Sequence, residues 1–293
     1  MNSKLSPGLG IVILLGVSTA FAANHVAARL AFDHGASVAT GIVIRAAGTA
    51  AVLLVLMRIA HIPLVLPKEL RGQALLAGLL VAVQSYCLYS AVALIPAALA
   101  LLVFQVCPML YVLLSWAMGK ETPRPMTFAA MALALAGLVL ALDITPERFS
   151  VQWAELGAGV SWAFAAAFSF AFVYYMNSHA LKPLDGRLRT FIMTTVTASV
   201  VVVAGAAAQK LRLPVDATGW VGIALLAVFY CIAMSSLFFV LPRLSAASTV
   251  ALNFEPIAAL VLAWIFLGQM IAPLQIVGAL ITVAAIASLG VKK

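Results

Sequence analysis

Long apolar segments separated by short polar ones run along the chain from end to end. Ten segments approach the roughly 20 apolar residues that a helix needs to cross a bilayer. They cover residues 9–30, 36–58, 72–93, 96–118, 126–143, 153–177, 189–208, 219–240, 246–268 and 272–290. Backbone polar groups need internal partners in lipid, and the alternation typical of barrel strands is absent. The pattern therefore predicts an all-α integral membrane protein with ten transmembrane helices.

The composition supports a lipid environment and argues against a nucleic-acid partner. Of the 293 residues, 65% are hydrophobic and 9% are charged, whereas a soluble domain carries about 25% charged residues. The net charge is +8, but the basic residues are scattered singly between apolar segments rather than gathered with aromatic residues. Such scattering is typical of membrane loops and not of a nucleic-acid surface.

The distribution of Lys and Arg predicts the orientation in the membrane. With both termini in the cytoplasm, 12 of the 17 basic residues lie on the cytoplasmic side. These are Lys4, Arg58, Lys68, Arg71, Lys120, Arg124, Lys182, Arg187, Arg189, Arg243, Lys292 and Lys293. The opposite side holds Arg29, Arg148, Lys210 and Arg212, and Arg45 lies inside a span.

The first span also has features of a cleavable signal peptide. Lys4 precedes an apolar stretch that contains the small-residue pattern Ala20-Phe21-Ala22. The same stretch recurs inside a later span, however, which favours a membrane helix that is retained.

The two halves of the sequence resemble each other. Residues 16–23 read GVSTAFAA and residues 159–166 read GVSWAFAA, so seven of eight positions match at an offset of 143. Four further pairs share an offset of 148: Pro108 and Pro256, Trp116 and Trp264, Glu121 and Gln269, and Pro125 and Pro273. The repeats are expected over residues 1–146 and 147–293.

Five spans per repeat is an odd number, so the two repeats must enter the membrane from opposite sides. They would be related by a pseudo-two-fold axis in the membrane plane. Secondary transporters use this inverted symmetry to alternate access to a central site. The sequence therefore indicates a transporter.

The stretch NFEPIAALVLAWIFLGQMIAPLQIVGALITVAAIASLG (253–290) resembles the signature of the EamA family of the drug/metabolite transporter superfamily. FQVCPMLYVLLSWAMGKETP (104–123) is a weaker copy of it. The chain departs from the family pattern at Thr19-Ala20, where Trp-Gly is common, and at Gln269, where Glu is usual. The resemblance implies a metabolite exporter of the bacterial inner membrane, and within the family the chain is similar to YddG-type exporters of aromatic amino acids.

Ionisable residues inside a membrane are costly and mark functional candidates. Glu255 directly precedes Pro256. Its carboxyl is expected either to bind a proton or substrate amine, or to be a structural partner of Arg45 or of a neighbouring backbone group. Arg45 could pin its helix through an ion pair or contact a substrate carboxylate. His25 is a weaker candidate for a ligand.

Polar and aromatic residues suggest the lining of a cavity. Gln105 and Asn253 are related by the offset of 148, and each lies three residues before its proline, Pro108 or Pro256. The two prolines are expected to break their helices and act as hinges. Alternatively, the two amides only join helices. The predicted substrate-binding residues are Asn24, Gln84, Tyr86, Tyr89, Gln105, Trp162 and Asn253.

No nucleotide-binding or hydrolytic motif is present in the sequence. We therefore expect a monomeric secondary transporter without a cofactor, not an enzyme. It would export amino acids, with a proton as a candidate coupling ion. Alternatives are a multidrug or quaternary-ammonium exporter, an exporter of nucleobases or sugars, and an integral-membrane enzyme. The four histidines are dispersed over both sides of the predicted topology, which argues against the enzyme.

Overall fold

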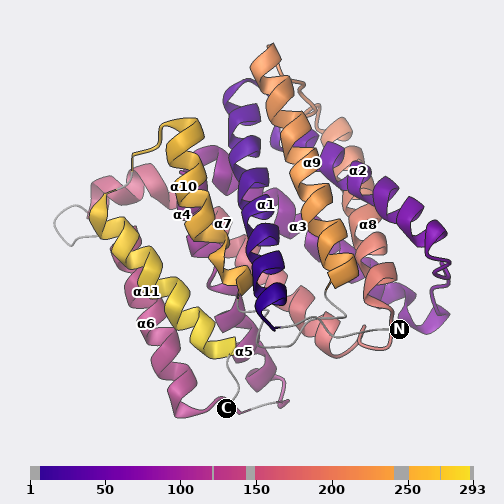
Figure 1. Cartoon of the computed structure of the whole chain (residues 1–293), viewed down its shortest axis with the longest axis horizontal. Coiled ribbons are helices and arrows are strands. Elements are labelled where there is room, and N and C mark those ends of the chain that lie inside the picture. The colour runs from indigo at the N-terminus through magenta and orange to yellow at the C-terminus, as the bar shows by residue number, and fades with distance from the viewer. Residues whose placement is uncertain (1–6, 121, 143–148, 241–250, 271, 291–293) are drawn as a thin grey trace.

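The computed structural model describes residues 7–120, 122–142, 149–240, 251–270 and 272–290. These residues form helices and no strands (Figure 1). The first half contains α1 (Pro7–Asp33), α2 (Val38–Ile59), the 3-10 helix η1 (Lys68–Leu70), α3 (Arg71–Leu94), α4 (Ala97–Phe104), α5 (Cys107–Ala117) and α6 (Pro125–Ala141). The second half contains α7 (Phe149–Ser178), α8 (Gly186–Ala207), α9 (Ala217–Val240), α10 (Glu255–Leu267) and α11 (Pro273–Gly290).

Seven helical segments are long and apolar enough to cross a membrane, counting α4 and α5 together. Three shorter apolar helices, over Pro125–Ala141, Ala251–Leu267 and Pro273–Ser288, occupy the remaining predicted spans. The predicted boundary between the repeats, at 146 and 147, lies outside the described residues, as do the first residues of the span predicted from 246.

Local sequence explains where several helices begin and end. The Ser37 hydroxyl caps α2 by accepting a hydrogen bond from the Thr40 backbone N–H at 3.2 Å. Asp185 caps α8 in the same way, accepting from the Arg187 N–H at 2.8 Å. Gly268 ends α10 with φ of 62°, a left-handed conformation that glycine adopts without steric cost.

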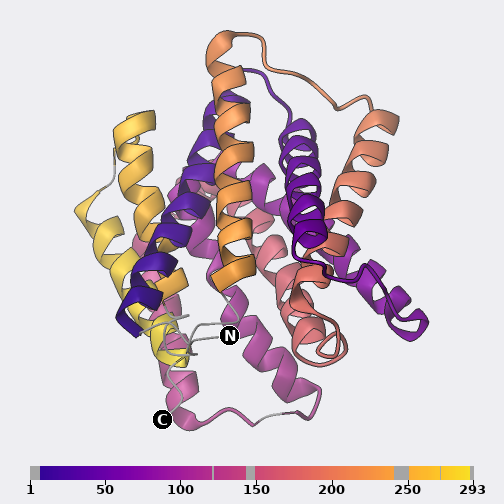
Figure 2. The ribbon, with the colours of Figure 1, turned by 45° about the vertical axis from the view of Figure 1, so that its right-hand side comes forward.

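Packing between the helices follows the inverted repeat. The offset of 148 relates the bounds of α2 and α8, from Val38 to Gly186 and from Ile59 to Ala207. The pairing of α1 with α9 is repeated by α7 with α3, and that of α2 with α9 by α8 with α3. The contact of α1 with α10 likewise corresponds to that of α7 with α5. Each repeat is thus completed by helices of the other (Figure 2).

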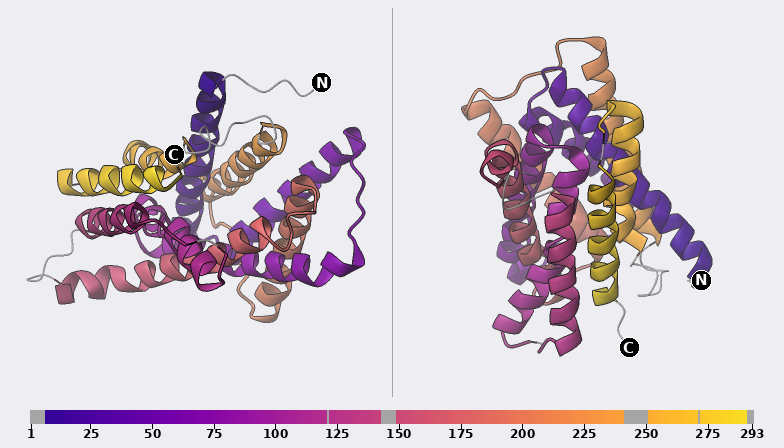
Figure 3. Two further views of the ribbon diagram at one scale, coloured as in Figure 1. Left: turned by 90° about the horizontal axis from the view of Figure 1, so that it is seen from below. Right: turned by 90° about the vertical axis from the view of Figure 1, so that its left-hand side faces the viewer.

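The contacts define two related bundles and a separate pair. We call α1, α2, α9 and α10 the first bundle, and α7, α8, α3 and α4–α5 the second bundle. Helices α6 and α11 pack on each other beside them (Figure 3). In this pair the Thr282 hydroxyl donates to the Ala134 carbonyl at 3.2 Å, and a Cβ on Gly278 would lie 2.5 Å from the Gly137 oxygen. Small residues therefore let the two backbones approach closely.

The loops at the two ends of the α2–α8 pair differ in chemistry. At one end the α1–α2 turn meets the α8–α9 loop: Ser37 N–H donates to the Arg212 carbonyl at 3.0 Å, and His34 Nδ1 lies 2.6 Å from Asp216 Oδ2. At the other end, leucines from α8 and the preceding turn pack against Ile62 and Leu66 of the α2–α3 loop. One contact is polar and the other is apolar.

Candidate functional site

Two helices are interrupted at equivalent places. Between α4 and α5, the Gln105 N–H still reaches the Leu101 carbonyl at 3.1 Å, but the next N–H, of Val106, donates three residues back. Pro108 is the second residue of α5. In the second half, a 3-10 turn over residues 251–254 precedes α10, and Pro256 is its second residue. The breaks lie just before the prolines, because a proline fits the first turn of a helix but not its interior.

The breaks face each other across the pseudo-two-fold axis. Gln105 Nε2 donates a long hydrogen bond to Asn253 Oδ1, at 3.5 Å. The turn before α10 is also held by Ser18 of α1, whose hydroxyl donates to the Ala251 carbonyl at 3.1 Å. The equivalent amides are therefore in contact, as expected from their related positions.

Glu255 begins α10 and lies within salt-bridge distance of His25, not of Arg45. The distance from Glu255 Oε1 to His25 Nε2 is 3.4 Å. The prediction of a Glu255–Arg45 ion pair was wrong, because α10 packs on α1 and brings the carboxylate to the histidine there. The carboxylate also lies in the first turn of α10, where the helix dipole favours negative charge. Its side chain is 25% exposed, so it lies at the edge of the buried region.

Asn24 joins three helices next to this pair. Its Nδ2 donates to the Leu226 carbonyl of α9 at 2.7 Å, and its Oδ1 accepts from the Tyr89 hydroxyl of α3. The rings of Tyr89 and His25 lie 5.2 Å apart. Asn24 is fully buried and Tyr89 nearly so, so their mutual hydrogen bond satisfies two polar groups that would otherwise be costly in the interior.

Arg45 lies between two aromatic rings. Its guanidinium carbon is 4.7 Å from the Tyr89 ring centre and 4.0 Å from that of Tyr230, and Nη2 donates to the Ser85 hydroxyl at 2.8 Å. The Ser85 hydroxyl in turn lies 3.3 Å from Gln84 Oε1. Within the described part of the chain, no carboxylate lies within salt-bridge distance of Arg45. Cation–π contacts take the place of the expected ion pair.

Two buried nitrogens in this network have no hydrogen-bond partner. They are Nδ1 of His25 and Nε of Arg45, on side chains that are 6% and 4% exposed. Unpaired buried polar atoms are rare in folded proteins and commonly mark a functional group or a binding site. The network of Asn24, His25, Arg45, Tyr89 and Glu255 is therefore the candidate site.

Tyr86 and Trp162 lie apart from this network. Their rings are 6.1 Å apart in an edge-to-face arrangement, and both line a groove between α3, α7 and α8. Trp162 is 39% exposed. The structure thus brings together Asn24, Tyr89, Arg45, Gln84 and Glu255, but it does not bring the two aromatic residues to them.

Exposure differs between the two parts of the broken α4–α5 helix. Every residue from Ala97 to Val103 in α4 is buried, whereas α5 has only Cys107, Met109 and Ser115 buried. Next to α5 lies a series of aromatic contacts: the ring centres are 5.7 Å apart for Phe104 and Phe170, and 4.7 Å for Phe170 and Tyr174. The α4 part of the broken helix is thus enclosed by the protein, and the α5 part is more exposed.

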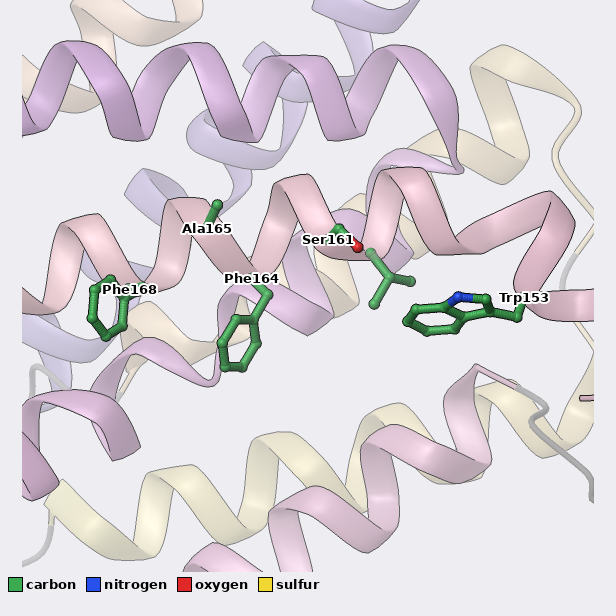
Figure 4. Close-up of a pocket in the computed structure, with 6 residues that line it drawn as sticks. Trp153, Ser161, Phe164, Ala165 and Phe168 are labelled. Carbon is green, nitrogen blue, oxygen red and sulfur yellow. The ribbon is translucent and has the colours of Figure 1, made fainter.

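A second depression, of about 480 Å³, lies along α7 (Figure 4). Figure 4 shows Phe164 and Phe168, which are four residues apart, on the same side of this helix. They are 46% and 52% exposed. The residues lining the depression carry no charge, which makes it a poor site for a polar solute.

Sequence reasoning gave too little weight to His25 and did not identify Tyr230. His25 could have been ranked higher because it directly follows Asn24 and is ionisable within a span. Tyr230 carries no such signal. Its role depends on the packing of α2 against α9, which the sequence does not reveal.

Comparison with known proteins gives a family and a fold. A model of the EamA-like transporter family matches residues 8–142 and again residues 157–291. No curated protein matches the chain in sequence. Among solved structures, 22 chains match. One, titled "Crystal structure of protein", is 18% identical, covers 97% of this chain and 98% of its own, and superposes with a TM-score of 0.66.

Proposed function

Because the chain belongs to the EamA-like transporter family, and is thus a multi-pass membrane transporter of the drug/metabolite superfamily, we propose that it exports amino acids. It would act as a secondary transporter, by alternating access to the network around Glu255. The observation that carries this proposal is the meeting of two broken helices beside an ionisable pair in an otherwise apolar protein. Half-helices that meet near the middle of a bilayer are the usual substrate and ion sites of secondary transporters.

The proposed topology has ten crossings, with both termini on the cytoplasmic side of a bacterial inner membrane. The excess of Lys and Arg on that side supports it. In this orientation the α5 end of the broken helix points to the cytoplasm. Its greater exposure then corresponds to a state that is open to the cytoplasm and ready to load a substrate.

The groups near the breaks suit an amino acid. Glu255 can pair with the substrate ammonium. The amides of Gln105 and Asn253 can donate to its carboxylate, since each carries two N–H donors. The rings of Phe104, Phe170 and Tyr174 can accept an apolar or aromatic side chain. A monomer contains all of these groups.

The same carboxylate offers a means of coupling. Glu255 can hold a proton or a substrate ammonium, but a single carboxylate does not hold both equally well, because protonation removes its charge. Exchange of the two would couple export of the substrate to entry of a proton. His25 lies close enough to receive that proton through its Nε2.

Export of cationic drugs is the alternative that these residues also favour. A carboxylate beside aromatic faces binds quaternary ammonium compounds through charge and cation–π attraction. The two functions differ in their need for a substrate carboxylate. An amino-acid exporter should reject amino-acid amides and amines, whereas a cation exporter should accept them.

Purified protein in proteoliposomes tests the proposal. Uptake would be measured for a panel of amino acids, their amides, cationic drugs and nucleobases, with and without a pH gradient. We expect transport of apolar or aromatic amino acids, accelerated by the gradient. If no amino acid is transported, the proposed substrate class is wrong. Transport of amides and drugs alone would support the cation exporter.

A further inference from the structure

A groove of about 390 Å³ lies outside the candidate site, on the membrane-facing side of α3. Residues of α3, α7 and α8 line it, together with one residue of α2. Its lining is mostly apolar, and its polar groups are one lysine, one tyrosine hydroxyl, one indole N–H and one thiol. The residues are Ala39, Ala82, Val83, Tyr86, Cys87, Trp162, Val200, Val201, Ala204, Gly205, Ala208 and Lys210.

The length of the groove matches one leaflet of a bilayer. Its α8 wall runs from Val200 to Ala208, which is about 12 Å at the helical rise of about 1.5 Å per residue. Half of a hydrocarbon core about 30 Å thick is about 15 Å. Val83 and Trp162 are 44% and 39% exposed, so the groove is open toward the surrounding lipid.

A positive charge is fixed at one end. The C-terminus of α8 is closed by Gln209 in a left-handed conformation (φ 52°) and by a 2.8 Å hydrogen bond from the Lys210 N–H to the Gly205 carbonyl. This closure holds Lys210 at the end of the groove, where it is part of the lining. Arg212 follows, and its backbone N–H donates to the Ser37 hydroxyl at 3.1 Å.

The nearby acidic residues are already engaged. Asp216 accepts from the Gly219 N–H at 2.8 Å and pairs with His34, while Asp33 pairs with Arg29 at 2.9 Å. Among the described residues, neither Lys210 nor Arg212 has a carboxylate within salt-bridge distance. This end of the groove therefore offers uncompensated positive charge to an anion.

The repeat indicates that the groove is particular to the second bundle. At the offset of 148, Ala204 and Gly205 of α8 correspond to Leu56 and Met57 of α2. Met57 is fully buried and packs against Leu184 and Leu188. Large side chains occupy the first repeat where small ones leave space in the second.

We propose that this groove binds one acyl chain of an anionic phospholipid, whose headgroup phosphate pairs with Lys210 and Arg212. Apolar walls of one leaflet's length fit the chain, and the uncompensated charge selects the headgroup. The lipid would lie in the leaflet at the C-terminal end of α8. This site is separate from the Glu255 network, so the proposal does not depend on the transported substrate.

Native mass spectrometry of the full chain in detergent tests the proposal, with phosphatidylglycerol and phosphatidylcholine as probes. Two variants attack the groove: Lys210→Gln removes the charge and Ala204→Phe fills the space. Two controls are matched to them. Lys182→Gln removes an exposed lysine at the other end of the molecule, and Val203→Phe enlarges a residue of α8 that is 68% exposed and does not line the groove.

We expect wild-type protein and both controls to retain phosphatidylglycerol in preference to phosphatidylcholine. Retention should fall at least about tenfold in Lys210→Gln, equivalent to one charge-assisted pair, and in Ala204→Phe. Lys210→Arg should retain the lipid, because it keeps the charge. Position 210 is exposed, so its variants should fold and can test the proposal even if Ala204→Phe does not fold. Equal retention by all variants would overturn the proposal. Displacement of the lipid by a transported solute would also overturn it, because the groove would then be a solute site. So would dimers that only Ala204→Phe abolishes, because the groove would then be covered by a second copy of the chain.

Discussion

The first and second bundles have the same helix packing but opposite chemistry. Asn24 and His25 of α1 correspond, at the offset of 143, to Ala167 and Phe168 of α7. At the offset of 148, Arg45 corresponds to Met193, and Glu255 to Cys107. The four network residues that the first bundle contributes thus have apolar or weakly polar residues at the related positions, and Tyr89 joins them from α3 of the second bundle.

This difference separates scaffold from site. Two related bundles can exchange conformations as the molecule opens to one side and then the other. A solute such as an amino acid has no two-fold symmetry, so its binding groups need to be present only once. The repeat therefore supplies the motion, and the departures from the repeat supply the chemistry.

The largest expected effect comes from replacing Arg45 of the first bundle with methionine, the residue at the related position 193 of the second bundle. Arg45→Met should lower the transport rate at least about tenfold, because Tyr89 and Tyr230 lose the cation that orients them beside Asn24 and His25. The same change should leave thermal unfolding in detergent unchanged or raise its temperature. Among the described residues Arg45 has no carboxylate partner, and burying an unpaired charge is costly, so an apolar replacement should not destabilise the fold.

Uptake and unfolding are measured on the same preparations of Arg45→Met. Arg45→Lys serves as the control, since it keeps the charge but loses the planar stacking, and its rate should fall between the two. Normal transport by Arg45→Met would show that the cation does not support the site.

The equivalent glycines of the repeated GVS motif give a second comparison. A Cβ on Gly159 of α7 would collide with the buried Ile95, whose Cγ1 would lie at 2.9 Å, whereas a Cβ on Gly16 of α1 meets nothing within 4 Å. Gly159→Ala should therefore destabilise the protein by about 1–3 kcal/mol. Gly16→Ala should be neutral or stabilising by up to about 1 kcal/mol. Thermal unfolding of the two variants in one detergent checks the pair.

The same glycines test alternating access. If the bundles exchange conformations, Gly16 must pack tightly in the opposite state, as Gly159 does here. Gly16→Val should then slow transport while leaving thermal unfolding of this state unchanged. Equal destabilisation by the alanine substitutions at 16 and 159, or rapid transport by Gly16→Val, would contradict the assignment of the two states.

The smallest expected effect is at the polar contact between loops. Backbone hydrogen bonding from Gly219, together with His34, lowers the pKa of Asp216. An acid whose pKa is lower in the folded state stabilises the fold above its ordinary pKa of 3.8, and this contribution disappears as the pH falls through the folded value. The unfolding temperature of the wild type should thus decline more steeply below about pH 4 than that of Asp216→Asn. Parallel curves would contradict this role.

Much of the fold could be predicted from the sequence, because lipid imposes a simple rule on apolar segments. The register of the repeat also placed Gln105 opposite Asn253. The sequence only partly revealed whether a span is one helix or two. The prolines indicated the interruptions. The 3-10 turn before α10, however, is held by tertiary contacts such as the hydrogen bond from the Ser18 hydroxyl to the Ala251 carbonyl. Helix bounds near proline thus need the structure.

The site was harder to predict because pairing depends on how helices face one another. Glu255 and Arg45 were each identified from the cost of burying a charge, yet that cost does not indicate the partner. The histidine on α1 and the tyrosine on α9 became partners only through the packing of the first bundle. The asymmetric tryptophan, Trp162, was expected near the substrate and instead lines the groove beside α3.

The central claim is that transport depends on the Glu255 carboxylate of the first bundle and not on Cys107, the related residue of the second bundle. Uptake of a labelled amino acid into proteoliposomes should be compared for wild type, Glu255→Gln and Cys107→Ser, with matched amounts of folded protein. We predict that Glu255→Gln loses at least tenfold in rate, about the worth of one charge-assisted hydrogen bond, together with the response to a pH gradient. Cys107→Ser should transport normally. Full, gradient-dependent uptake by Glu255→Gln would contradict the account.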